Sequence, residues 1–205
     1  MHRRTFISAL PLALAGETGM LFSRQQEKAP TAEPYEDHEA YAVYAAALLL
    51  NRPHQEAITG AKLLVIEKHV EAWTESTIEW SGIKLNKGAE RDWLEVLRDY
   101  VQANQVAREL KDLFPIDRPY KLITAKERDE ALKGKWETYY KRFPKGSGPI
   151  SFSSVGFNKP KTRAIVNVFH ICHYLCGGGG PHFLEKRDEK WREVRVDATV
   201  QVIAI

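Results

Sequence analysis

The sequence lacks the short motifs that identify common enzyme chemistries. It has no Gly-x-Ser-x-Gly elbow and no His-Glu-x-x-His helix, so the signatures of serine hydrolases and zinc proteases are missing. The four glycines from Gly177 to Gly180 are not followed by the Lys-Ser or Lys-Thr pair that ends a nucleotide-binding P-loop. No motif identifies a reaction, and we therefore expect no cofactor and assign no catalytic residue and no metal ligand.

An excess of one charge is also missing. The chain has 30 basic and 27 acidic residues, and loss of Arg3 and Arg4 with a leader would leave 28 basic residues against 27 acidic ones. This balance gives no electrostatic reason to expect binding to nucleic acid or to an anionic membrane surface. We therefore expect a small molecule or a protein as the partner.

The N-terminus has the order of features that a secretory signal peptide requires. Arg3 and Arg4 precede an uncharged stretch from Thr5 to Ala15, and Ala13 and Ala15 form the small-residue pattern of a cleavage site. The stretch is shorter than the roughly 20 residues that cross a bilayer, so we expect no integral membrane segment after its removal. The paired arginines fit a twin-arginine signal and also an ordinary Sec signal, and both routes stay open. We predict a periplasmic or secreted protein.

The remaining chain predicts a polar linker at 16–34 and a single α+β domain at 35–205. A capping-box pair, Thr124 and Glu127, marks the start of one helix. Helices that precede a series of short strands are typical of helices packed on an antiparallel meander. Helices are predicted at Asp37–Leu50, Glu90–Phe114 and from residue 125 to Phe143, and strands at 61–67, Ile150–Phe157, Arg163–Ile171, Pro181–Lys186, Lys190–Val196 and Ala198–Ile205.

Both cysteines of the chain lie between Phe169 and His182, beside the four glycines. In an exported protein a Cys172–Cys176 disulfide is the first interpretation. A zinc site is a second, but strand alternation would place His170 and Cys172 on the face opposite His173. A cysteine nucleophile activated by a histidine and two buried unpaired thiols remain as further alternatives. The glycines favour a wide hairpin connection or a bulge over a phosphate site, because strand-like residues follow them.

Five segments resemble a group of uncharacterised exported bacterial proteins. They are Val155-Gly156-Phe157-Asn158, Thr162-Arg163-Ala164, Cys172 to Gly179 with its C-x-x-L-C-G-x-G pattern, Leu184-Glu185-Lys186 and Lys190-Trp191. The chain departs from the group at Glu189, where a glycine is more usual. The resemblance implies one recurrent exported domain and assigns no catalytic residue.

These observations lead to a functional hypothesis. The domain is an exported, non-catalytic binding module for a small molecule, a peptide or a protein partner. One alternative is an exported hydrolase with His170 or His173 as its base, and another is a metal-binding module.

Overall fold

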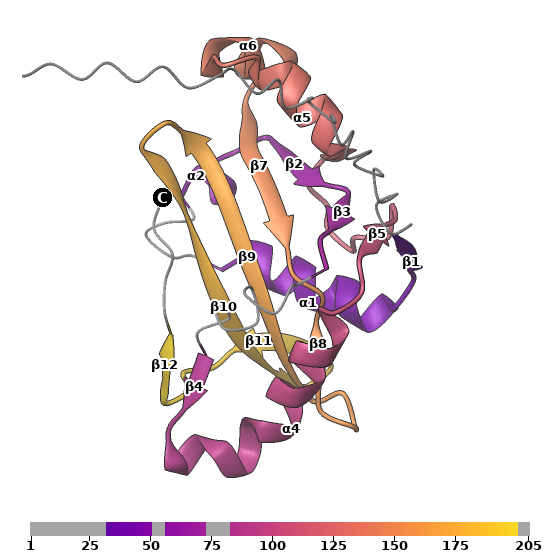
Figure 1. Cartoon of the computed structure of the whole chain (residues 1–205), viewed down its shortest axis with the longest axis vertical. Coiled ribbons are helices and arrows are strands. Elements are labelled where there is room, and N and C mark those ends of the chain that lie inside the picture. Colours follow the sequence, from indigo (N-terminus) through magenta and orange to yellow (C-terminus); the bar gives the residue numbers. More distant parts are fainter. Residues whose placement is uncertain (1–31, 51–55, 73–82, 201–205) are drawn as a thin grey trace, which may run out of the picture.

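The structure is a computed structural model that describes residues 32–50, 56–72 and 83–200. These residues form an α+β fold, as the sequence predicts (Figure 1). The helices lie mostly before a strand-rich C-terminal part. None of the described helices has the length and hydrophobicity of a transmembrane span.

The predicted leader falls outside the described residues. This applies to Arg3 and Arg4 of the export motif and to Ala13 and Ala15 of the cleavage site. The first described strand begins at Glu33, two residues before the predicted start of the domain.

The main sheet contains seven strands. They are β2 (Leu63–Glu67), β6 (Tyr120–Ile123), β7 (Gly146–Phe152), β8 (Gly156–Phe157), β9 (Arg163–His173), β10 (Cys176–Arg187) and β11 (Lys190–Glu193). Their order is β11-β10-β9-β7-β2-β6, with β8 paired to β9. From β7 to β11 the pairs are antiparallel, which confirms the predicted meander. β2 extends the sheet by pairing parallel with β6 and β7, so the sheet is mixed, and its parallel strands require the long connections between them.

Helices cover both faces of β9 at different places along the strand. The helices of the fold are α1 (His38–Leu48), α2 (Glu56–Thr59), α4 (Lys87–Ala103), α5 (Ala125–Leu132) and α6 (Trp136–Arg142). On one face Val166 and Val168 share a core cluster with α1. On the other face α4 covers Ile165 and the α5–α6 pair covers Ile171. On this second face Ile165 is buried, whereas Phe169 and Ile171 are only half-buried.

The helix predicted at 90–114 is correct only in its first part. α4 ends at Ala103, and the fully buried Asn104 follows as its cap. The Asn104 amide donates to the Ser154 carbonyl oxygen (3.1 Å) and accepts from the Ser154 amide (2.8 Å). The side chain thus fastens the loop between β7 and β8, because a buried amide needs such partners.

After Asn104 the chain forms a strand where a helix was predicted. β5 (Arg108–Leu110) pairs parallel with β1 (Glu33–Tyr35) and antiparallel with β3 (His69–Val70) in a separate three-stranded sheet. Pairing with distant strands therefore overrides the local helical spacing of this segment.

The helix predicted from residue 125 to Phe143 is divided in two. Its capping box is present as predicted, since Thr124 Oγ1 accepts from the Glu127 amide and the Glu127 carboxylate accepts from the Thr124 amide. Lys133 and Gly134 have positive φ angles of 28° and 74°, which end α5 before α6 begins.

The meander has one strand fewer than predicted. β12 (Ala198–Val200) leaves the main sheet and pairs with β4 (Ile83–Leu85). The rest of the strand predicted at Ala198–Ile205 lies outside the described residues. β11 is therefore the outermost strand beside β10 among the described residues.

Candidate functional site

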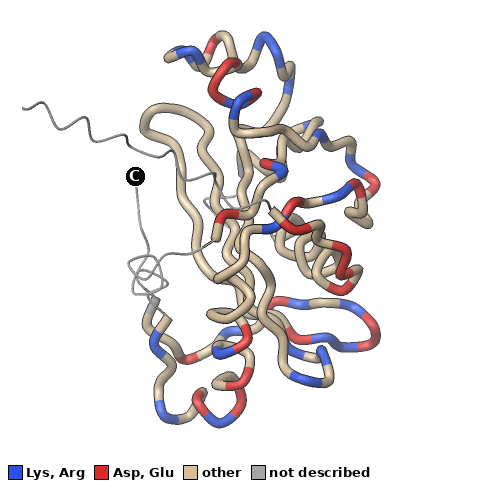
Figure 2. The backbone as a smooth tube through the Cα atoms, turned by 45° about the vertical axis from the view of Figure 1, so that its right-hand side comes forward, with Lys and Arg blue, Asp and Glu red and all other residues tan. Residues whose placement is uncertain are grey.

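The β9–β10 hairpin carries no charged side chain along most of its length. No Lys, Arg, Asp or Glu occurs from residue 164 to residue 184, in a chain in which such residues make up 28% of the sequence. The hairpin is accordingly drawn without red or blue over this length in Figure 2. Depletion of charge is a property of interface cores, and this run is the signal that a search for short motifs missed.

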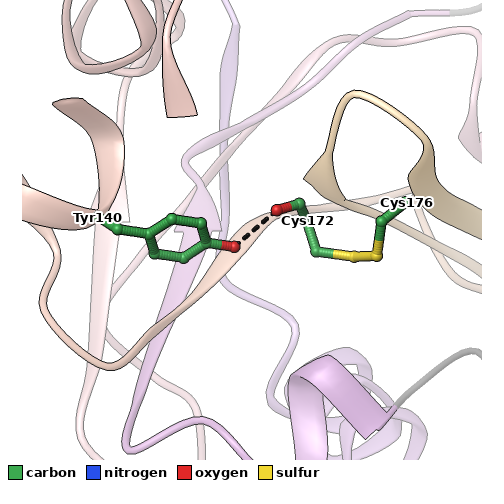
Figure 3. The surroundings of a disulfide bond; sticks show 3 residues. All are labelled: Tyr140, Cys172 and Cys176. Atoms are coloured by element: carbon green, nitrogen blue, oxygen red, sulfur yellow. Dashed lines mark hydrogen bonds between the residues drawn. A yellow bond between two sulfur atoms is a disulfide. The ribbon is translucent and has the colours of Figure 1, made fainter. Parts of the chain in front are cut away.

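A bulge shapes the tip of this hairpin. The turn is Tyr174–Leu175, between the paired residues His173 and Cys176, whereas Gly177 pairs with Ile171. Cys172 is therefore an extra residue in β9, and the bulge lets it reach across to Cys176. The two cysteines form a disulfide with a Cα–Cα distance of 5.1 Å, within the normal range (Figure 3).

The four glycines lie in β10 itself, opposite residues 168–171 of β9, and not in a wide connection. The Phe169 ring covers Gly179, where an added Cβ would lie 2.3 Å from the Val168 carbonyl oxygen and 2.8 Å from the ring. Gly178 and Gly180, by contrast, face open space. Since β10 continues through Pro181, no helix N-terminus is present here to bind a phosphate.

Helix α6 and the turn that precedes it hold the tip in place. The Tyr140 hydroxyl donates to the Cys172 carbonyl oxygen (2.7 Å, Figure 3), and the Tyr174 hydroxyl donates to the Gly134 carbonyl oxygen (2.6 Å). Burial raises the pKa of Tyr140, so this donor keeps its proton at neutral pH. The Trp136 ring stacks on His173 with centroids 6.1 Å apart. Leu175 is 95% exposed at the end of this ordered tip.

The three histidines of the segment are separated by the fold. His170 is buried, and its ring lies with Cys172 and Cys176, the candidate ligand atoms all within 4.8 Å of one another. His173 is exposed and stacks on the Trp136 ring, outside this group. His182 is buried elsewhere, with Nδ1 2.9 Å from Glu193 Oε1. The described cysteines are both oxidised, so neither is a thiol nucleophile in this state.

The outer edge of β10 is open toward the tip. β11 pairs only with Leu184 to Arg187, and the Val194 amide donates to the Phe183 carbonyl oxygen just beyond that pairing. From Cys176 to His182, no strand in the described part of the chain pairs with this edge. Because Phe183 points its carbonyl outward, alternation directs the amide and carbonyl groups of Gly177 and Gly179 outward as well.

A hollow of about 490 Å³ lies elsewhere, between α4 and the loop that follows β8. Its carboxylates already have partners in the chain. Asp99 accepts from the Phe157 amide (2.7 Å), Glu95 accepts from the Lys159 amide (3.2 Å), and Asp37 pairs with Lys161 (2.8 Å). These contacts fasten the loop, so we place the candidate site on the hairpin.

No family model, no curated protein and no solved structure matches the chain.

Proposed function

We propose that this chain is an exported, non-catalytic binding module that accepts an extended segment of a partner protein along the free edge of β10. The observation that supports the proposal is the outer edge from Gly177 to Pro181, which carries no charge and pairs with no described strand. The sequence of residues 1–15 supports delivery to the periplasm or the exterior, where a disulfide is stable.

An open edge of this kind is unusual in a protein that binds nothing. Natural proteins protect edge strands with lysines and other charges, with prolines, or with a covering element, because an open edge recruits other strands. In β10, Pro181 is the single residue of this type between Cys176 and Phe183. Pro181 has no amide hydrogen to donate from the outer edge of β10, whereas the amide of Gly179 can still donate there.

The chemistry of the edge indicates the kind of partner. Strand addition obtains its affinity from main-chain hydrogen bonds and its specificity from side chains that alternate between the two faces. Gly178 and Gly180 leave open space on one face, which the side chains of an added strand can fill. Because no Lys, Arg, Asp or Glu lies on the hairpin from residue 164 to residue 184, the partner segment is expected to be uncharged and rich in β-branched residues.

The tip is ordered before any partner binds. The Cys172–Cys176 disulfide and the hydrogen bond from Tyr140 fix the end of β10, so little conformational freedom is left to lose on binding.

The test uses short random peptides displayed on phage and selected on the oxidised protein. We expect the recovered peptides to be uncharged and β-branched. Their binding should protect the amides of Gly177 and Gly179 from hydrogen exchange, since these amides would donate to the added strand.

Gly180→Lys is the informative variant, because a Cβ at Gly180 meets nothing within 4 Å and the charge is placed at the edge. It should weaken peptide binding about tenfold or more, which corresponds to about 1.4 kcal/mol. Gly88→Lys adds the same charge on α4, also where a Cβ meets nothing, and should leave binding unchanged. Equal binding by the Gly180→Lys protein, or protection elsewhere than on β10, would refute the proposal.

A further inference from the structure

The disulfide has an imidazole beside it. Two sulfur atoms and a ring nitrogen, from Cys172, Cys176 and His170, lie within 4.8 Å of one another. His170 and Cys172 are buried, whereas Cys176 is exposed to solvent. All three residues belong to the β9–β10 hairpin. The bulge at Cys172 turns that residue toward Cys176.

We propose that reduction of the disulfide converts the hairpin tip into a binding site for a thiophilic metal ion, Zn²⁺ or Cu⁺, with His170, Cys172 and Cys176 as ligands. The inference does not depend on strand addition at β10. It concerns the reduced state, whereas the binding proposed above belongs to the oxidised protein.

The geometry suits such an ion once the sulfur–sulfur bond is opened. Around a tetrahedral zinc the ligand atoms are about 3.5–3.8 Å apart, as follows from bonds of about 2.3 Å to sulfur and 2.0 Å to nitrogen. The three ligand atoms already lie within 4.8 Å of one another, so small side-chain rotations are sufficient. Three protein ligands leave one position open for solvent on the exposed Cys176 side, as in sites that exchange a ligand. Soft thiolates with an imidazole select Zn²⁺ and Cu⁺ over Mg²⁺ or Ca²⁺.

The change of state balances with a thiol reductant. Two thiol molecules transfer two electrons and two protons to the disulfide, giving two cysteine thiols and one external disulfide. Binding of the ion then releases the two cysteine protons, because thiolates are the ligands. Cys176 is the accessible sulfur for the first attack, since Cys172 is 8% exposed.

The histidines provide a matched pair of variants. His170 lies with the sulfur atoms, whereas His173, three residues later, is exposed and stacks on Trp136 outside this group. His170→Gln removes a ligand, and His173→Gln makes the same chemical change outside the site. Cys176→Ser removes an exposed ligand and cannot disturb the buried core.

The purified protein is reduced with a phosphine, freed of oxygen, and titrated with Co²⁺, Zn²⁺ and Cu⁺ separately. One equivalent should bind, and Co²⁺ should give sulfur-to-metal charge-transfer absorption. The oxidised protein should bind none at the same concentrations. His170→Gln should weaken binding at least about tenfold, a loss typical even of an outer-shell partner, and should alter the Co²⁺ spectrum.

The Zn²⁺ and Cu⁺ titrations identify which ion is preferred. Circular dichroism of oxidised His170→Gln protein establishes whether that variant is folded, and Cys176→Ser must lose binding in any case. The proposal fails if the reduced protein binds no stoichiometric metal, if Cys176→Ser retains the affinity, or if His173→Gln loses as much as a folded His170→Gln protein.

Discussion

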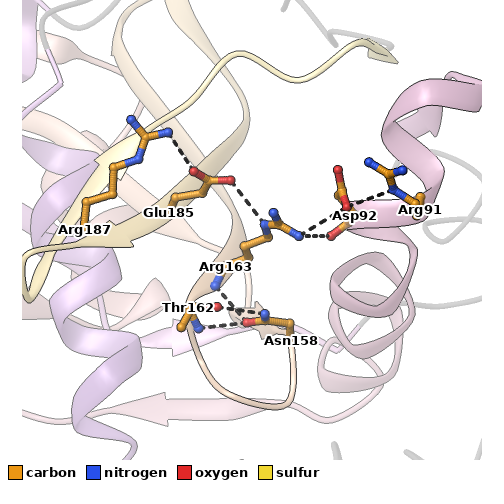
Figure 4. A network of polar contacts seen from close by, with 7 residues as sticks. All are labelled: Arg91, Asp92, Asn158, Thr162, Arg163, Glu185 and Arg187. Carbon is orange, nitrogen blue, oxygen red and sulfur yellow. Dashed lines mark hydrogen bonds and ion pairs between the residues drawn. The ribbon is translucent and has the colours of Figure 1, made fainter.

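At the base of the β9–β10 hairpin, Arg163 joins the two strands to α4, whereas at the tip a disulfide takes the place of charged contacts. Arg163 Nε donates to Glu185 (3.2 Å) and its Nη1 donates to the Asp92 carbonyl oxygen (2.9 Å), as Figure 4 shows. Glu185 also accepts from Arg187 (2.8 Å). The tip contains no such pair, and Cys172–Cys176 closes it covalently.

The difference follows from what surrounds each end. The base is flanked by α4, β8 and β11, so burial of Ile165 and Leu184 stabilises it and polar contacts add orientation. The tip is contacted by α6 and the turn before it on one side and is open along the outer edge of β10. A covalent link stabilises an end that has little apolar surface to bury, and it leaves the edge free for a partner.

The largest expected effect is at the base, where Gly156 of β8 meets α4. A Cβ at Gly156 would lie 2.3 Å from the Tyr100 Cα, and a backbone atom cannot give way without displacing the helix. Gly156→Ala should therefore lower the free energy of unfolding in urea by about 3 kcal/mol. Gly88→Ala, with nothing within 4 Å of its Cβ, should change it by less than about 1 kcal/mol. Equal values for the two variants would contradict this close approach.

The second effect is at the tip. Replacing both Cys172 and Cys176 by serine should lower the free energy of unfolding by at most about 2 kcal/mol, because the link closes a loop of only a few residues. Amide exchange should accelerate from Ile171 to Gly178, while the amides near Arg163 keep their protection. Faster amide exchange at both the tip and the base would mean that the two ends unfold as one unit and are not stabilised separately.

The sequence predicted β9 well and the strand beside it less well. β9 follows from local alternation, which depends on near neighbours. β10 begins at Cys176 and not at the predicted Pro181, because the glycines pair with β9 instead of forming a wide connection. β5 could not be predicted in this way, because Leu110 and Phe114 fit the helical spacing that continues from α4. Its strand conformation depends on β1, far away in the chain.

The candidate site shows the same limit. Strand alternation predicted opposite faces for His170 and His173, but the bulge at Cys172 interrupts the alternation between them. The open edge of β10, however, depends on where β11 and β12 pair, and β12 joins β4 instead of extending the meander. The bulge that brings Cys172 to Cys176 also depends on the pairing register, which a single sequence does not specify.

A smaller effect concerns the turn at the base between β10 and β11. Asp188 and Glu189 have φ angles of 50° and 58°, the left-handed conformation of a two-residue hairpin turn. Glu189→Gly removes the steric cost of this conformation and should raise the free energy of unfolding by about 1 kcal/mol. Glu189→Ala is the control, because it also removes the ion pair with Lys186 (3.2 Å) but keeps a side chain. If alanine stabilises as much as glycine, the backbone explanation is wrong.

The smallest effect distinguishes the two ends by pH. The hydrogen bond from Arg187, together with Arg163, lowers the pKa of Glu185 below its ordinary value, although burial opposes the shift. A pKa lowered by folding means that the stabilisation is present above the unfolded-state pKa and is lost as pH falls through the folded-state value. Acid should therefore weaken the base, by about 0.5 kcal/mol for this carboxylate. The tip from Cys172 to Cys176 has no carboxylate to titrate.

Two readouts check this contrast between the ends. The free energy of unfolding should decline as the pH falls below the ordinary glutamate pKa, and Glu185→Gln should make this decline shallower. Glu90→Gln removes an exposed carboxylate of α4 and should leave the decline unchanged. In the same pH range, amide exchange, corrected for its intrinsic rate, should increase near Glu185 at a higher pH than at the Tyr174–Leu175 turn. The reason is that a disulfide does not titrate. A tip that loosens first in acid would show that the disulfide does not hold this end independently of the ion pairs at the base.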